Sequence, residues 1–193
     1  MTDYSIITLH GKTPRIHPSA FIAPGCRIIG DVEIGEQASI WYNCVIRADV
    51  NFIHIGARSN VQDGTVIHCD SEMKTGGCPT IIEEDALIGH MAMLHGCTIR
   101  SNALVGLGGI VMDGCVIESG GMLAAGGMLT PGKTIASGQM WGGRPAKYMR
   151  DLDENWAMGN RMAVAHYVEN GQAHKAAITG QSGEREFPLD SLP

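Results

Sequence analysis

Aromatic residues, basic runs and long hydrophobic segments are scarce in this chain of 193 residues. Phe, Trp and Tyr make up only 5% of the sequence, so a broad core built on large rings is not expected. No apolar run approaches the roughly 20 residues that a membrane span needs. Residues 1–8 also lack the basic start and apolar stretch of a signal peptide. We therefore expect a cytoplasmic protein with no membrane contact.

Positive charge is also in short supply, because the formal net charge is −6 at pH 7 and no basic cluster is present. This balance argues against nucleic acid as a partner. The six cysteines form no C-x-x-C pair, so they do not resemble a disulfide or zinc-finger framework and are expected to be reduced. The expected partners are small molecules and further copies of this chain.

Glycine, in contrast, is abundant at 26 residues, and apolar residues recur every six positions. They occupy Ile16, Ile22, Ile28, Ile34, Ile40, Ile46, Ile55, Val61, Ile67, Ile82, Ile88, Leu94, Ile99, Val105, Val111, Ile117, Leu123, Leu129, Ile135 and Trp141. A period of six fits neither a helix nor a lone alternating strand. It fits short strands joined at corners, three to a coil of about 18 residues. The pattern predicts an all-β fold, a parallel β-helix of about seven coils.

The sequence outside the repeat divides into segments of different pattern. We expect an N-terminal lead-in at 1–15, the β-helix at 16–144, a C-terminal helical segment at 145–178 and a tail at 179–193. Residues 151–154 resemble a capped helix start. The expected apolar face of this helix contains Leu152, Trp156, Ala163 and Tyr167. The polar tail is predicted to be either disordered or an arm onto a neighbouring subunit.

The repeat relates two of the eight histidines to each other. His68 follows Ile67 and His95 follows Leu94, and 27 positions separate the two histidines. An inserted loop accounts for nine of these positions, which leaves 18, or one coil. His95 is therefore expected directly above His68, and the same arithmetic places Arg47 one coil earlier in the same ladder. Two imidazoles one strand spacing apart can share a metal ion.

A third histidine, His90, lies with Gln62 on the preceding face of the predicted prism and points away from this ladder. Threefold packing would set the His68 and His95 face of one subunit against the His90 face of the next. Three histidines with an open fourth position are typical of catalytic zinc sites. We therefore predict a homotrimer with zinc between subunits, although three imidazoles also accept ferrous iron or cobalt. The alternative is a chance coincidence of three surface histidines.

The motifs that carry these residues resemble the active-site motifs of the gamma-class carbonic anhydrases. They are Arg47-Ala48-Asp49, Ser59-Asn60-Val61-Gln62-Asp63-Gly64, His68, Ile88-Gly89-His90 and Leu94-His95-Gly96. The resemblance extends over residues 16–171. It implies a left-handed β-helix, a homotrimer and three interfacial metal sites, each with His68 and His95 from one subunit and His90 from its neighbour.

The same resemblance assigns roles to the polar residues around the histidines. Asn60 and Gln62 match residues that orient the metal-bound hydroxide and carbon dioxide. Arg47 and Asp49 match a charged pair that crosses the subunit interface, and Asp63 matches another network residue near the site. Trimer assembly would then create the site itself.

The inserted loop departs from the archetypal members of the family. It is short, and Ser71 stands about where they carry a proton-shuttling glutamate. Asp70 and Glu72 are possible substitutes. The sequence thus resembles the short-loop bacterial branch, in which Tyr167 matches a tyrosine that reaches the metal site; core packing is the alternative role for Tyr167.

The leading functional hypothesis is reversible hydration of carbon dioxide to bicarbonate by a metal-bound hydroxide. The same chemistry could instead hydrolyse an acyl-CoA thioester, and a non-catalytic trimeric scaffold that retains the metal is a further alternative. Hexapeptide-repeat acyltransferases share the coil, but they use one basic histidine and lack a chelating ladder. Acyl transfer is therefore the least favoured hypothesis.

Overall fold

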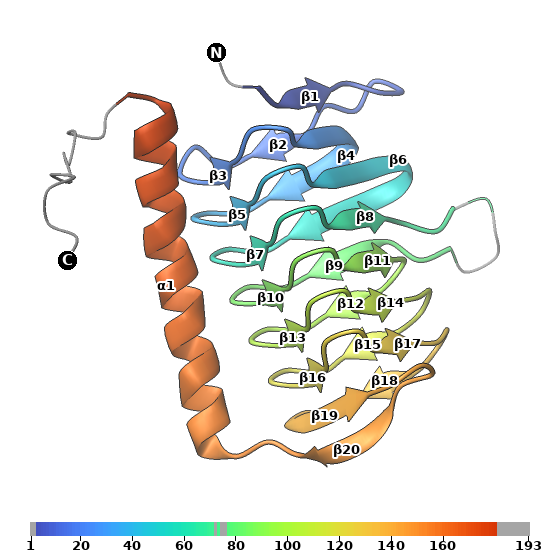
Figure 1. Ribbon diagram of the computed structural model, residues 1–193. Helices are drawn as coiled ribbons and strands as arrows, with labels where there is room; N and C mark the ends of the chain where they lie inside the picture. The colour runs from blue at the N-terminus through green and yellow to red at the C-terminus, as the bar shows by residue number, and fades with distance from the viewer. Residues whose placement is uncertain (1–2, 72, 74–76, 181–193) are drawn as a thin grey trace, which may run out of the picture.

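The computed structural model describes residues 3–71, 73 and 77–180, and in this range the chain forms a parallel β-solenoid of about seven coils. Three strands make one coil, and each pairs in parallel with the strand one coil further on (Figure 1). One helix, α1 (Glu154–Ile178), lies along the length of the solenoid. This architecture matches the predicted β-helix with a C-terminal helix.

One side of the solenoid, here called the helix face, carries α1. Its strands pair with one another in an eight-stranded sheet that β20 completes. They are β3 (Phe21–Ile22), β5 (Ser39–Ile40), β7 (Asn60–Val61), β10 (Leu87–Ile88), β13 (Leu104–Val105), β16 (Met122–Leu123), β19 (Gln139–Gly142) and β20 (Lys147–Asp151). Every pair is parallel except β19 with β20, which closes the end of the solenoid as an antiparallel hairpin.

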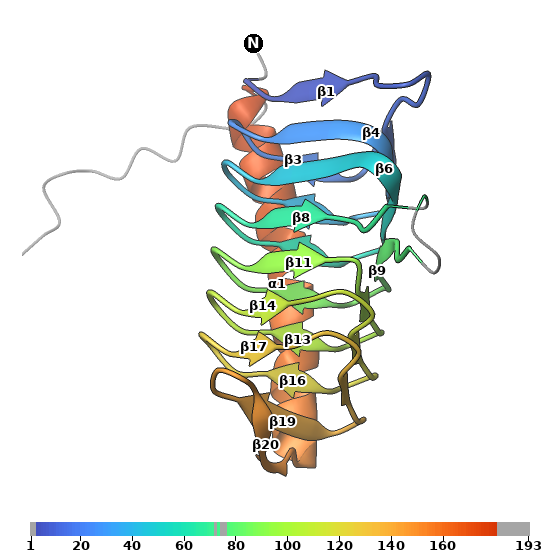
Figure 2. The ribbon, with the colours of Figure 1, turned by 90° about the vertical axis from the view of Figure 1, so that its right-hand side faces the viewer.

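The next side, here called the ladder face, is turned toward the viewer in Figure 2. It consists of β1 (Ser5–Ile7), the first parts of β4 (Arg27–Ile34) and β6 (Val45–Ile55), β8 (Val66–His68), β11 (Met93–His95), β14 (Ile110–Val111) and β17 (Met128–Leu129). Because β4 and β6 continue around a corner, this face shares one twelve-stranded sheet with the third face. The third face contains their last residues with β2 (Arg15–Ile16), β9 (Thr80–Ile82), β12 (Thr98–Ile99), β15 (Val116–Ile117) and β18 (Thr134–Ile135).

The six-residue repeat forms the interior of the solenoid. All twenty predicted positions are buried except Ile16, Ile22 and Trp141, which are partly buried at the two ends. Successive coils align their inward aliphatic residues, so that Ile46 pairs with Ile67 and Ile67 with Leu94. Each fully buried aliphatic side chain contributes about 1.5–3 kcal/mol relative to exposure. The six cysteines are free, and all but Cys78 are buried.

The helix begins at the capped start expected at residues 151–154. The Asp153 side chain caps it by accepting a hydrogen bond of 2.8 Å from the Trp156 N–H. Residues 147–151 form β20 instead of helix, so the segment expected to be helical from residue 145 opens with a strand. No helix among the described residues is long and apolar enough to cross a membrane.

The surface by which α1 contacts the solenoid is rotated from the expected apolar stripe. Asn160, Val164 and Gly171 are its buried residues. Gly171 approaches Ser39 and Phe21 so closely that a Cβ atom would lie 3.3 Å from Ser39 Cβ. Leu152 precedes the helix, and Trp156, Ala163 and Tyr167 are only half-buried at its flank. The helix therefore packs most closely through Asn160, Val164 and Gly171, with Tyr167 against the core at its flank.

Candidate metal centre

The ladder face brings two of the predicted ligands together. His68 and His95 end β8 and β11 and are direct register partners, as the coil arithmetic predicts. His68 Nδ1 lies 3.0 Å from His95 Nε2. Two imidazole nitrogens that share a tetrahedral zinc at about 2.05 Å lie roughly 3.3 Å apart. The observed separation is therefore close to the distance that chelation needs.

Asp49 binds the His68 ring nitrogen that faces away from His95. Its Oδ1 atom lies 2.7 Å from His68 Nε2, and its Oδ2 atom accepts a hydrogen bond from Arg47. Burial would raise the pKa of the Asp49 carboxyl, but the hydrogen bonds from His68 and Arg47 outweigh it and leave that pKa below its usual value. The predicted interface pair is thus joined to the histidine ladder within one chain.

Asp113 was not among the predicted residues, yet its Oδ1 atom is hydrogen-bonded to His95 Nδ1. It lies two positions beyond Val111, which pairs with Leu94 one coil earlier. Counted from the equivalent inward residue, Asp49 lies three positions after Ile46, so the two carboxylates flank the ladder at offsets that differ by one residue. A search for carboxylates near the ladder on the next coil would have found this residue.

His90 lies at the corner between the helix face and the ladder face. Its Nδ1 atom lies 2.7 Å from Asp63 Oδ2, and the other Asp63 oxygen accepts a 3.2 Å hydrogen bond from the Tyr42 N–H. The His90 side chain is 41% exposed. The following residue, Met91, adopts a left-handed φ of +56°, which is unusual for a bulky side chain. The backbone thus turns sharply beside this histidine.

Asn60 and Gln62 are buried on the helix face. Gln62 Nε2 donates a 3.0 Å hydrogen bond to Asn60 Oδ1. Among the described residues, the buried Asn60 Nδ2 atom has no hydrogen-bond partner. An unpaired buried amide is costly, so this donor is suited to bind an acceptor atom of a ligand.

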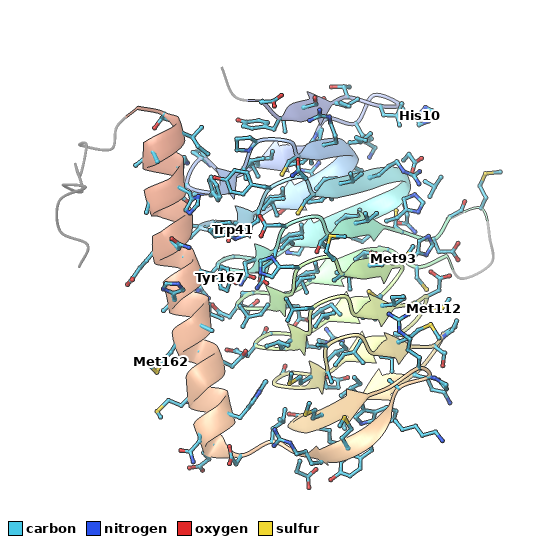
Figure 3. The ribbon with its side chains drawn as sticks, in the orientation of Figure 1. His10, Trp41, Met93, Met112, Met162 and Tyr167 are labelled. Atoms are coloured by element: carbon cyan, nitrogen blue, oxygen red, sulfur yellow. The ribbon has the colours of Figure 1, made fainter. Side chains whose placement is uncertain are left out.

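Tyr167 lies near these amides at the flank of α1, with its ring edge-on to Trp41 at a centroid distance of 5.6 Å (Figure 3). Burial raises the pKa of the Tyr167 hydroxyl, and the nearby Asp63 charge raises it further. Tyr167, Gln62 and His90 line a cavity of about 400 Å³. The other walls of this cavity are mostly apolar and include Leu87, Leu104, Leu107, Met122 and Ala163.

The predicted site residues therefore form two groups on different faces of one chain. Arg47, Asp49, His68 and His95 lie on and beside the ladder face, whereas Asn60, Gln62, Asp63, His90 and Tyr167 belong to the helix face and its corner. Within the described part of a single chain, no three His, Cys, Asp or Glu side chains converge as a metal site. Of the two candidate proton carriers, Asp70 accepts a hydrogen bond from the Ser71 N–H, and Glu72 lies outside the described residues.

The chemistry of the three histidines fits a metal. Each imidazole has a carboxylate partner on one nitrogen: Asp49 for His68, Asp63 for His90 and Asp113 for His95. Metal-binding histidines commonly use one nitrogen for such a partner, which orients the ring and leaves the other nitrogen for the metal. A metal could therefore be held by His68 and His95 with His90 of a second copy.

Comparison with known proteins places this chain in a family. Residues 13–48 match the family model described as bacterial transferase hexapeptide (six repeats). The chain is 46% identical over 181 residues to a carbonic anhydrase of Geobacillus kaustophilus, covering 92% of this chain and 97% of that protein. It is 44% identical over 184 residues to the mitochondrial gamma carbonic anhydrase 3 of Arabidopsis thaliana, covering 95% of this chain and 71% of that protein.

A solved structure of a hexapeptide transferase family protein from Anaplasma phagocytophilum is also similar, with 44% identity and a TM-score of 0.82. The matched region covers 88% of this chain and 97% of the Anaplasma chain. Fold and comparisons together define a hexapeptide-repeat β-solenoid protein. More narrowly, the chain belongs to the gamma-class carbonic anhydrase family. It spans 62% and 63% of the length of two further mitochondrial relatives from Arabidopsis.

Proposed function

We propose that this protein is a metal-dependent carbonic anhydrase whose sites form between the subunits of a homotrimer. His68 and His95 of one subunit and His90 of the next would hold the metal. The observation that carries the proposal is the pair of imidazoles on successive coils, whose facing nitrogens lie 3.0 Å apart. A third histidine, His90, lies on another face with a carboxylate partner. The bacterial and plant relatives are themselves named as carbonic anhydrases, which supports the same activity.

Exposed apolar side chains support the trimer. Val66 and Met93 project from the ladder face with exposed fractions of 42% and 47%, and Met91 and Leu107 at the adjoining corner reach 71% and 54%. Apolar side chains gathered beside a half-formed polar site are suited to contact between subunits. Because the contact joins two different faces, threefold rotation closes it into a ring.

The metal would supply a water molecule whose pKa falls toward about 7, so that hydroxide is available near neutral pH. We propose zinc, although the three-imidazole donor set also accepts ferrous iron or cobalt. Asp49, Asp63 and Asp113 would hold the three rings in place through the nitrogens that the metal does not use.

The buried amides would bind the substrate. Asn60 Nδ2, which has no partner among the described residues, and the remaining Gln62 N–H would donate hydrogen bonds to an oxygen of carbon dioxide. Tyr167 would close this pocket from the side of α1. Addition of hydroxide to the carbon then yields bicarbonate. The proton released from water leaves to buffer, with Asp70 and Glu72 as the candidate carriers in the short loop.

Hydrolysis of an acyl thioester at the same site is a second candidate function, and the cavity beside His90 favours it. Its volume of about 400 Å³ falls within the range of about 300–1,000 Å³ that is typical of pockets for organic ligands. Carbon dioxide, with three heavy atoms, needs far less room. The apolar walls formed by Leu87, Leu104 and Met122 would suit an acyl chain.

One pair of assays tests these functions. Zinc-loaded trimer should hydrate carbon dioxide in a stopped-flow assay, and His95→Ala should remove both the metal and the activity. Acyl-CoA hydrolysis is measured on the same preparations. Hydrolysis without hydration would replace the leading proposal by the second candidate, and bound zinc with neither activity would favour a trimeric scaffold.

A further inference from the structure

Asp113 binds a histidine of the ladder but lies outside the motifs that carry the family resemblance. It follows β14 and reaches back by one coil to His95 Nδ1. A carboxylate oxygen accepts hydrogen bonds, so this contact favours the tautomer in which His95 Nδ1 carries the proton. The lone pair of His95 is then on Nε2, the atom that lies 3.0 Å from His68 Nδ1. Asp113 thus selects the tautomer in which His95 offers a lone pair toward its neighbour.

Gly96 makes room for this carboxylate. A Cβ atom on Gly96 would lie 2.6 Å from Asp113 Oδ1 and 3.2 Å from Cys78 Cβ, both closer than ordinary contact. The backbone of Gly96 also adopts a left-handed φ of +54°. It is fixed on both sides, because its N–H donates a 3.0 Å hydrogen bond to Thr80 Oγ1 and its carbonyl accepts one of 2.7 Å from the Gly114 N–H.

We propose that Asp113 is a positioning residue for His95, and that Gly96 is required because it leaves space for the Asp113 carboxylate. The proposal rests on the metal site of the proposed function but not on the reaction performed there. Asp113 acts on the metal only through the His95 ring. The hydrogen bond to His95 Nδ1 and the close approach to Gly96 are both made by residues of this chain alone.

The first test compares Asp113→Ala with Asp113→Asn in the purified full-length chain. In metal-free protein, ¹⁵N-resolved imidazole spectra should show the Nδ1–H tautomer of His95 in the wild type and a mixture of tautomers in Asp113→Ala. Zinc affinity, measured by competition with a chelator, should fall about 10- to 100-fold in Asp113→Ala. Asp113→Asn keeps an acceptor oxygen in a side chain of the same shape and should recover most of the affinity. The tautomer of His95 is the readout that a purely structural role of Asp113 would not change.

The second test uses Gly96→Ala in two backgrounds. In the wild type, Gly96→Ala should lower zinc affinity because its methyl group displaces the Asp113 carboxylate. In Asp113→Ala the same change should lower stability through the left-handed φ but leave zinc affinity unaltered. Gly120→Ala is the matched control, since Gly120 has a φ of +67° and nothing within 4 Å of an added Cβ. It should cost stability without a change in zinc affinity.

The outcomes separate this proposal from the proposed function. Wild-type protein that binds zinc through His95 but does not hydrate carbon dioxide would overturn the function and leave the role of Asp113 intact. An unchanged His95 tautomer and unchanged zinc affinity in Asp113→Ala would overturn the role of Asp113. So would an equal loss of affinity on Gly96→Ala in both backgrounds. If Asp113→Ala does not fold, the comparison of Asp113→Asn with Gly96→Ala decides, because only Gly96→Ala should lose affinity.

Discussion

The two halves of the candidate site differ in how completely one chain pairs their polar groups. On the ladder face, hydrogen bonds join Asp49 to both Arg47 and His68 and join Asp113 to His95, and the two imidazoles face each other with their nitrogens 3.0 Å apart. On the helix face, His90 is bound to Asp63, but the buried Asn60 amide has an unpaired donor among the described residues, and Gln62 and His90 line a cavity. In the ladder half, contacts between side chains of one chain orient the polar groups, whereas the helix half has polar groups left to bind a ligand.

This difference follows from how each half is built. Strand register stacks the ladder residues at the spacing of a sheet, which suits hydrogen bonds between neighbouring coils. The helix half is formed where a corner, a strand and α1 meet, and these elements leave a space between them. A site assembled from both halves would combine rigid metal ligands with an adaptable substrate pocket. The following predictions test this division, from the largest expected effect to the smallest.

Separating the halves by mutation should abolish metal binding, and recombining them should restore it. His68→Ala and His90→Ala should each lose zinc and activity, because each removes one ligand from every site. After subunit exchange in an equal mixture, about a quarter of the interfaces should regain all three histidines. Zinc per subunit and the hydration rate measure the recovery. Mixed trimers that bind no zinc would show that His90 is not supplied by a neighbouring chain.

A charge on the ladder face should prevent the two halves of the site, supplied by different subunits, from coming together. Met93→Glu places a carboxylate on a side chain that is 47% exposed in one chain and would be buried between subunits. Sedimentation velocity should show loss of the trimer, with loss of zinc. Met162→Glu is the matched control, because Met162 is 66% exposed on α1 and points away from the solenoid (Figure 3). An intact Met93→Glu trimer would place the interface on another face.

Filling the cavity should distinguish the two candidate reactions of the helix half. Ala163→Leu inserts a larger side chain into the wall of the cavity. It should slow acyl-thioester hydrolysis about tenfold and should change carbon dioxide hydration little, since that substrate needs less room. Ala165→Leu, at an exposed position of the same helix, serves as the control. Equal losses in both reactions would indicate that the cavity is part of the carbon dioxide pocket.

The smallest effect is expected from the loop. If no loop carboxylate carries the proton, raising the buffer concentration should raise kcat and leave kcat/KM nearly unchanged, because the proton leaves after bicarbonate forms. Asp70→Asn and Glu72→Gln should then have almost no effect in stopped-flow assays. A large loss of kcat in either variant, rescued by concentrated imidazole, would instead identify a shuttle in the short loop.

The sequence by itself determined the solenoid and the ladder. A period of six, with an apolar residue at one position in each repeat, predicts short stacked strands. Counting repeats across the inserted loop then predicted that His68 pairs with His95. The resemblance then supplied roles for the polar residues. The division of the site between subunits and the metal itself remain predictions.

Only the tertiary structure decided the features that depend on three-dimensional approach rather than on period. These are the strand β20, the rotated contact face of α1, the cavity beside His90 and the hydrogen bond from His95 to Asp113. β20 forms because it pairs antiparallel with β19 at the open end of the solenoid, and α1 packs through Gly171 because small residues allow close approach. Asp113 lies outside the ladder register, and it reaches His95 only because Gly96 has no side chain between them.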